Sequence, residues 1–263
     1  DESESRGLGD VYKRQIVTGA ANGIGLAIAR HFIECGANVM HADMDEASLL
    51  KELGSGTGDV EQTYFAGDLR EKLTIANLIS ATLDAYDRVD ILINASRQVL
   101  ASDFFDPEDK SVEISLEQNV LTSLRLSQHV ARRMIKQSEG QNEGQVGAIV
   151  NLSSIAARRA TPSLLGYSIS SAALDQMTRS MAVALAPKRI RVNAVAIGSV
   201  MSASLQQALK DHGDFRSDIE EHTPLARVAP ATEVAETVQY LASESAGFVT
   251  GACVDCGWWT HSD

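Results

Sequence analysis

The sequence predicts a single α/β domain built on a parallel β-sheet. From Ile16 onward, short apolar runs alternate with longer amphipathic patterns, which is typical of repeated βαβ units. The chain has 263 residues, 44% of them apolar, which is enough to bury one large core. No internal repeat or linker-like stretch divides it. We therefore expect one sheet of about seven strands with helices on both faces.

Each apolar run bounded by polar or turn residues is a predicted strand. The strands are expected at 16–18, 38–42, 63–66, 91–93, 148–152, 191–196 and 252–255. Helical patterns lie between them, at 23–35, 45–53, 71–86, 111–137, 166–186 and 232–243. Residues 199–228 form a long excursion, with short helical pieces at 202–210 and 215–221, and such excursions often carry substrate contacts.

The two ends of the chain are set aside from the fold. Residues 1–15 are polar, contain no signal-peptide pattern and are expected to be a non-native or disordered tail. Lys13, Arg14 and Gln15 stand where the first half of an apolar strand belongs. The predicted domain is therefore 16–258, with 199–228 as its substrate-loop region and 259–263 as a C-terminal tail.

Charge and cysteine usage exclude several classes of partner. A formal net charge of -12 disfavours nucleic acid and anionic membranes, and no apolar run reaches the roughly 20 residues that span a bilayer. The cysteines, Cys35, Cys253 and Cys256, are too few for a disulfide scaffold and fit a reducing, cytoplasmic setting. Cys253 and Cys256 have no second pair to complete a zinc site, so we expect no metal.

A glycine-rich turn follows the first predicted strand and opens the first helix. It reads Thr18-Gly19-Ala20-Ala21-Asn22-Gly23-Ile24-Gly25. Glycines here let the backbone turn tightly and approach a pyrophosphate, which lies at the positive end of the helix. An acidic residue, Asp43, ends the second strand, as in dinucleotide-binding units. The sequence thus predicts a doubly wound, Rossmann-type sheet.

A second set of motifs lies in the other half of the chain. Asn151-Leu152-Ser153-Ser154 ends a strand, Tyr167 follows thirteen residues later, and Arg191-Val192-Asn193 and Thr250-Gly251 come further on. With the glycine turn, this layout resembles the short-chain dehydrogenase/reductase family over residues 16–258. The resemblance implies interconversion of a secondary alcohol and a ketone. It assigns proton transfer to Tyr167, a hydrogen bond to the substrate oxygen to Ser154, and support of a relay water to Asn119.

The same resemblance assigns the cofactor site. Asp43 can accept both ribose hydroxyls of NAD but would repel a 2′-phosphate, and Asn22 and Met44 stand where NADP-dependent members usually place a base. We therefore expect NAD. Beyond Asp43, the residues expected around it are Thr18, Gly19, Asn22, Gly23, Ile24, Gly25, Asp68, Leu69, Asn94, Ala95, Gly198 and Ser202.

Three positions depart from the family pattern. Ser171 replaces the lysine four residues after Tyr167, so a hydroxyl stands where a positive charge belongs. Arg97 replaces a glycine close to the cofactor, and Ile197 replaces a proline. Arg97 either points into the cleft and supplies the missing charge as a fixed cation, or points into solvent, the usual place for arginine, which we favour.

Two functions remain open from the sequence. The chain is either an NAD-dependent oxidoreductase with a weakened or rearranged proton relay, or an NAD-binding homologue that acts as a scaffold with little turnover. Leu100, Phe104, Phe105, Leu164 and Leu165 suggest a small apolar alcohol or ketone as substrate. The resemblance also implies a homo-oligomer, a tetramer or dimer, through the helices at 111–137 and 166–186.

Overall fold

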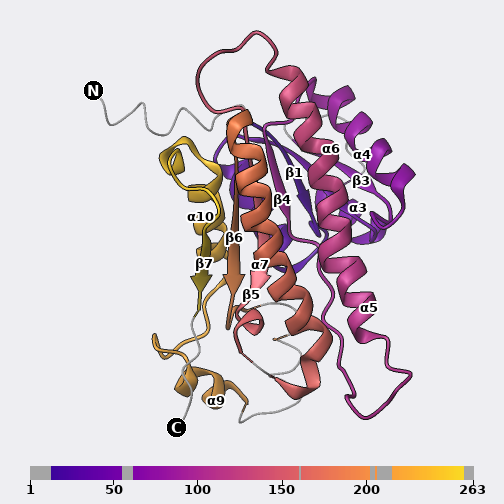
Figure 1. The fold of residues 1–263 in the computed structure, drawn as a ribbon, viewed down its shortest axis with the longest axis vertical. Helices are drawn as coiled ribbons and strands as arrows, with labels where there is room; N and C mark the ends of the chain where they lie inside the picture. The colour runs from indigo at the N-terminus through magenta and orange to yellow at the C-terminus, as the bar shows by residue number, and fades with distance from the viewer. Residues whose placement is uncertain (1–12, 55–61, 160, 202–204, 206–214, 258–263) are drawn as a thin grey trace.

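The computed structural model describes residues 13–54, 62–159, 161–201, 205 and 215–257. Their seven strands form one parallel sheet in the order β3-β2-β1-β4-β5-β6-β7 (Figure 1). The strands are β1 Arg14–Thr18, β2 Asn38–Asp43, β3 Gln62–Ala66, β4 Ile91–Asn94, β5 Gly147–Ser154, β6 Ile190–Ile197 and β7 Cys253–Cys256. The predicted sheet is confirmed. Because the chain builds β1 to β3 outward and then returns to β4 beside β1, the strand order reverses between β1 and β4.

Helices connect the strands on both faces of the sheet. They are α2 Gly23–Glu34, α3 Glu46–Leu53, α4 Lys72–Tyr86, α5 Ser111–Leu116, α6 Thr122–Gln137, α7 Leu165–Leu185, α9 Phe215–His222 and α10 Ala231–Ala242. Short 3₁₀ turns lie at Ile155–Ala157 (η2), Pro162–Leu164 (η3), Ala186–Lys188 (η4) and Glu244–Ala246 (η5). No helix in this part of the chain is long and apolar enough to cross a membrane.

Two apolar clusters fill the space between sheet and helices. One joins α2 and α10 to the sheet, with Phe32, Ile28 and Val238 fully or almost fully buried. The other joins α4, α6 and α7 to the opposite face, around Leu78 and Met134. The strand interiors are apolar on both faces, as expected for a parallel sheet with helices on each side.

The first strand begins earlier than predicted. β1 starts at Arg14 rather than Ile16, because Arg14 pairs with Asn38 and its carbonyl accepts from the Asp90 amide at 2.8 Å. Gln15 is thereby fully buried, and neither its amide nitrogen nor its amide oxygen has a hydrogen-bond partner among the described residues. The pairing of backbone groups keeps two polar residues in a strand that their side chains disfavour.

The predicted helix at 111–137 contains a local change of winding. Residues Glu117–Leu121 (η1) form a π-helical segment between α5 and α6. Such single-turn widenings are frequent at functional sites. This one contains Asn119, which it places beside the loop after β4.

Candidate active site

The glycine turn lies where β1 and β4 end side by side. Gly19 has a φ of +67°, and a side chain there would come within 2.8 Å of the Ser96 Cα. A Cβ on Gly25 would overlap the Gly19 carbonyl. The Thr18 hydroxyl accepts from the amides of Ala95 at 2.9 Å and Ser96 at 3.0 Å. The predicted residues Thr18, Gly19, Gly25 and Ala95 are therefore in direct contact at this edge.

The first turn of α2 faces this edge with an unneutralised helix end. Asn22, in extended conformation, precedes Gly23 and Ile24 and makes no side-chain cap. No acidic residue lies in the first turn. An open helix N-terminus beside close-packed glycines is suited to a phosphate group.

Asp43 is held against the glycine turn. One carboxylate oxygen accepts from the Ala21 amide and the other from the Asp45 amide, both at 3.1 Å. A carboxylate has about four acceptor positions, so two remain for ligand hydroxyls. Met44 beside it is exposed and uncharged.

Asp68 has a partner that the sequence did not suggest. The Arg70 guanidinium donates to both carboxylate oxygens, with Nε at 2.9 Å from Oδ1 and 3.0 Å from Oδ2. Hydrogen bonding from Arg70 holds the pKa of Asp68 below its ordinary value. Leu69, between the two in sequence, is buried. The Asp68 carboxylate is therefore already ion-paired in this structure.

The candidate catalytic side chains come from three elements and are all buried. Ser154 ends β5, Tyr167 lies in the first turn of α7, and Asn119 lies in η1. The Ser154 hydroxyl accepts from the Ala156 amide at 3.2 Å and donates to the Ile197 carbonyl at 3.3 Å. Both bonds are long, and they fix Ser154 at the carboxyl end of the sheet.

Arg97 points into this site, so the favoured outward orientation is wrong. Its Nη1 donates to the Tyr167 hydroxyl at 2.7 Å and to the Ser153 carbonyl at 3.0 Å. Its Cζ lies 5.8 Å from the centre of the Tyr167 ring. Hydrogen bonds and a facing aromatic ring offset the cost of withdrawing the guanidinium from water. The Arg97 Nη1 thereby bridges the Tyr167 hydroxyl and the carbonyl of Ser153, the residue before Ser154.

Ser171 does not occupy the same space. Its hydroxyl donates to the Tyr167 carbonyl at 2.8 Å, one turn back along α7, and its side chain is buried. Serine commonly bonds in this way inside helices. The hydroxyl that replaces the lysine is therefore turned to the helix backbone.

Asn119 is tied to the loop that carries Arg97. Its Oδ1 accepts from the Gln98 amide at 2.7 Å, and its Nδ2 donates to the Gln98 carbonyl at 3.0 Å and to the Ser170 hydroxyl at 3.1 Å. Gln118, the preceding residue, donates to the Ser96 hydroxyl at 3.2 Å. The Asn119 side chain therefore holds the loop after β4, and its support of a relay water, which the resemblance implies, stays a prediction.

Of three other predicted residues, two make contacts within the fold and one lies outside the described residues. Asn94 is buried and donates to Ser127 at 3.0 Å and to Asn151 at 2.8 Å. A side chain on Gly198 would overlap the Gly257 carbonyl, so the ends of β6 and β7 meet backbone to backbone. Ser202 lies outside the described residues.

The expected apolar substrate wall is only partly formed. Phe104 and Phe105 are strongly exposed and meet edge to face, with their ring centres 5.4 Å apart. Within the described ranges, no group of three His, Cys, Asp or Glu residues could hold a metal. Burial raises the pKa of the Cys253 thiol to about 12, which makes it a poor nucleophile.

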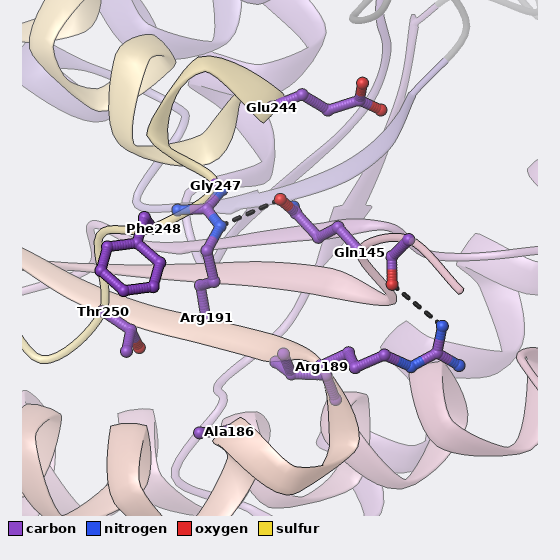
Figure 2. Close-up of a pocket in the computed structure, with 10 residues that line it drawn as sticks. Gln145, Ala186, Arg189, Arg191, Glu244, Gly247, Phe248 and Thr250 are labelled. Carbon is purple, nitrogen blue, oxygen red and sulfur yellow. Dashed lines mark hydrogen bonds between the residues drawn. The ribbon is translucent and has the colours of Figure 1, made fainter. Parts of the chain in front are cut away.

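A separate hollow of about 590 Å³ lies at the other end of β6 (Figure 2). Arg191, at the start of that strand, donates to Gln145 at 2.9 Å and to the carbonyls of Leu241 and Ser243 at 2.6 and 2.8 Å. Its guanidinium thus binds the last turn of α10. Ligands of open α/β sheets bind at the carboxyl ends of the strands, so this hollow is not the candidate active site.

Comparisons with known proteins agree with the geometry. A family model described as enoyl-(acyl carrier protein) reductase matches residues 19–258. The oxidoreductase UcpA of Salmonella typhimurium is 30% identical over 246 residues, covering 91% of this chain and 90% of that protein. An uncharacterized oxidoreductase of Mycobacterium tuberculosis is 29% identical over 92% of this chain and 90% of its own length.

A solved structure has nearly the same fold. It is a 7α-hydroxysteroid dehydrogenase in complex with NADH and 7-oxo glycochenodeoxycholic acid, with a TM-score of 0.86 and 27% identity. The match covers 98% of this chain and 99% of that one.

Proposed function

Because the chain belongs to the short-chain dehydrogenase/reductase family, we propose that it is an NAD-dependent oxidoreductase that interconverts a secondary alcohol and a ketone. The observation that carries the proposal is the grouping of Tyr167, Ser154 and Arg97 at the sheet edge that also holds the glycine turn. A hydroxyl that can exchange a proton stands there beside a fixed positive charge.

The chain's own residues fit a nicotinamide dinucleotide. Gly19 and Gly25 leave backbone surface that any side chain would fill, and α2 presents an open N-terminus. Asp43 retains acceptor positions for ribose hydroxyls, and the residue after it, Met44, is not a base that could pair with a 2′-phosphate. Both features favour NAD over NADP. The NADH in the hydroxysteroid dehydrogenase complex supports the same cofactor class.

In this reaction the protein has to bind the substrate oxygen and to transfer the proton of the alcohol hydroxyl. When bound, the nicotinamide accepts or supplies the hydride. In the oxidation direction, Tyr167 takes the proton of the alcohol hydroxyl as the carbonyl forms. In reduction it returns that proton to the oxygen. Ser154, held by two long hydrogen bonds, can exchange one of them for the substrate oxygen.

The substrate class is proposed as a small or medium-sized apolar alcohol or ketone. Leu100, Leu164 and Leu165 are only partly buried near the site, and Phe104 and Phe105 lie exposed beyond them. The proposal also includes a homo-oligomer, because Ile169 and Val183 of α7 and Ile114 of α5 are exposed apolar side chains. Three free thiols suit a reducing, cytoplasmic setting.

A second candidate is a scaffold that binds NAD and turns over little. The hydroxyl of Ser171, turned to the helix backbone, favours it, as does the ion pair that occupies Asp68. One experiment separates the two. NADH and NADPH binding is measured by fluorescence titration, and secondary alcohols, hydroxysteroids included, are assayed with NAD for wild type, Tyr167→Phe and Ser154→Ala.

We expect NADH to bind more tightly than NADPH, and turnover to fall by about 10²–10⁴ in Tyr167→Phe. If the protein binds the cofactor but turns over no alcohol, the result supports the scaffold function instead of the enzyme. Turnover that is equal in wild type and Tyr167→Phe would refute the proposed proton transfer.

A further inference from the structure

We propose that Arg97 is a catalytic residue, the cation that stabilises the Tyr167 phenolate in place of the absent lysine. This inference rests on the proposed function and names a further participant in it. Arg97 touches the atom that exchanges the proton, since its Nη1 lies 2.7 Å from the Tyr167 hydroxyl. The Ser171 hydroxyl donates to the Tyr167 carbonyl, so the cation comes from a different element than in the family pattern.

The charge on Arg97 is not neutralised by a carboxylate within the described ranges. Its recorded partners are a carbonyl and a phenol, both uncharged, and its side chain is half-buried. Several other arginines there pair with acids, among them Arg30, Arg70, Arg88, Arg125, Arg158 and Arg227. A half-buried cation without a counter-ion is costly. An anion formed at Tyr167 would supply that counter-ion.

The loop that carries Arg97 is fixed on both sides. Thr18 accepts from the amides of Ala95 and Ser96, and Asn119 bonds both backbone groups of Gln98. The guanidinium is then anchored to the Ser153 carbonyl. A cation held in this way needs no reorganisation when charge develops on the phenol oxygen, which is how preorganised sites stabilise charge.

Because the cation is an arginine, it stabilises charge in the reaction but transfers no proton. In oxidation, the proton leaves the alcohol oxygen for the Tyr167 phenolate, the carbinol hydrogen leaves as hydride to the oxidised nicotinamide, and a carbonyl forms. Reduction reverses each transfer. The guanidinium keeps its protons throughout and acts only as a fixed charge, whereas a lysine ammonium can also give up a proton.

Other charges near Tyr167 have partners elsewhere or lie away from its hydroxyl. Glu117 of η1 pairs with Arg125, and Arg158 after η2 pairs with Asp175 of α7 and Asp255 of β7. The remaining charged side chains on α7 and on the elements packed against it are Glu113 of α5, Arg179 of α7, Lys188 of η4 and Arg191 of β6. None of these charges has a recorded contact with the Tyr167 side chain, and Arg97 has two.

The test uses the full chain with Arg97→Met, which removes the charge, and Arg97→Lys, which keeps it. Arg88→Met is the matched control, because Arg88 pairs with Asp90 just before β4, at the opposite edge of the sheet. Circular dichroism checks that each variant is folded. We expect Arg97→Met to lower kcat at neutral pH by about 10²-fold, with Arg97→Lys retaining more activity and NADH binding unchanged. The lost rate should be partly recovered as pH rises.

A second readout needs neither cofactor nor substrate. Ultraviolet absorbance of the phenolate, taken as the difference between each protein and its Tyr167→Phe counterpart, should develop at higher pH in Arg97→Met than in wild type. Equal titrations with and without Arg97 overturn the inference, as does Arg97→Lys being as slow as Arg97→Met. If the titrations differ but no alcohol reacts, the proposed function fails, and what remains is only that Arg97 stabilises the Tyr167 phenolate.

Discussion

Asn119 holds the backbone of Gln98 from both directions, accepting from its amide at 2.7 Å and donating to its carbonyl at 3.0 Å. The pair joins the π-helical segment to the loop after β4. Because Gln98 follows Arg97 directly, the position of the guanidinium depends on Asn119.

The first prediction concerns this pair. Asn119→Ala removes both hydrogen bonds to the Gln98 backbone, each worth about 0.5–1.5 kcal/mol of unfolding free energy. We also expect kcat to fall, because Arg97 loses its fixed position. Urea denaturation and steady-state kinetics measure the two effects. Ser138→Ala, which removes a hydroxyl bond to the Ile135 carbonyl at the end of α6, is the control and should leave kcat unchanged. An Asn119→Ala protein that keeps wild-type kcat would contradict the link to Arg97.

The second prediction concerns cofactor choice. Asp43→Ser removes the carboxylate that we propose meets the ribose hydroxyls, and NADH affinity should fall about 10- to 100-fold. NADPH affinity should fall less or rise, because the repulsion of the 2′-phosphate is lost. Asp45→Ala, which removes the α3 cap that accepts from the Ser48 amide, should lower stability without changing the ratio of the two affinities. Fluorescence titration gives both affinities, and an unchanged ratio in Asp43→Ser would argue against the proposed role.

The third prediction concerns Ser171. If Arg97 already supplies the cation, Ser171→Lys should not raise kcat in the wild-type background. In an Arg97→Gly background, the same substitution should raise kcat by about tenfold or more, because a cation is then restored near Tyr167. A large gain in the wild-type background would mean that Arg97 does not supply the charge. The four kcat values form a double-mutant cycle.

The fourth prediction concerns stability at the first strand. Gln15 is fully buried, and in the part of the chain that the structure describes neither polar atom of its side chain has a hydrogen-bond partner. Gln15→Val should raise the unfolding free energy by about 1–3 kcal/mol, because the cost of burying an unpaired amide is removed. Gln62→Val, at a half-buried position of β3, should change it by less than about 0.5 kcal/mol. Equal effects of the two substitutions in denaturant titrations would contradict the prediction.

The fifth prediction concerns pH. Desolvation by burial lowers the pKa of His41 from its ordinary 6.5. The unfolded chain therefore binds a proton near pH 6.5 that the folded chain binds only at lower pH, so stability is full above 6.5 and falls as the pH drops below it. The loss is at most about 1.4 kcal/mol per pH unit for one group. Replacing His41 by Leu should flatten this slope, and replacing exposed His129 by Leu should not.

The fold was predictable because its determinants are local and repetitive. Apolar runs located all seven strands, and the turn from Thr18 to Gly25 marked the nucleotide end, since glycines there have few substitutes. The start of β1 was missed. There, pairing of Arg14 with Asn38 outweighs side-chain preference, and tertiary pairing of that kind leaves no local signal.

The site was only partly predictable, for a reason that concerns long side chains. The positions of Tyr167 and Ser154 follow from a helix start and a strand end. The direction of Arg97 depends on the Ser153 carbonyl and the Tyr167 hydroxyl, 56 and 70 residues further along the chain. The Arg70 pair with Asp68 and the grip of Asn119 on Gln98 likewise depend on contacts that spacing does not encode. The sequence offered one signal of this arrangement, which is that the motifs lack a lysine at position 171 and have an additional arginine at position 97.

The contact of Gly198 with Gly257 has a consequence for how this chain can change. Two backbones that touch without a side chain between them tie the end of β7 to the strand that leads into the 199–228 region. The glycine turn at the other end of the sequence belongs to the same edge. Recombination or trimming near residue 257 would therefore disturb the edge of the sheet that holds the reacting groups. The last strand should tolerate fewer insertions than its distance from Tyr167 in sequence suggests.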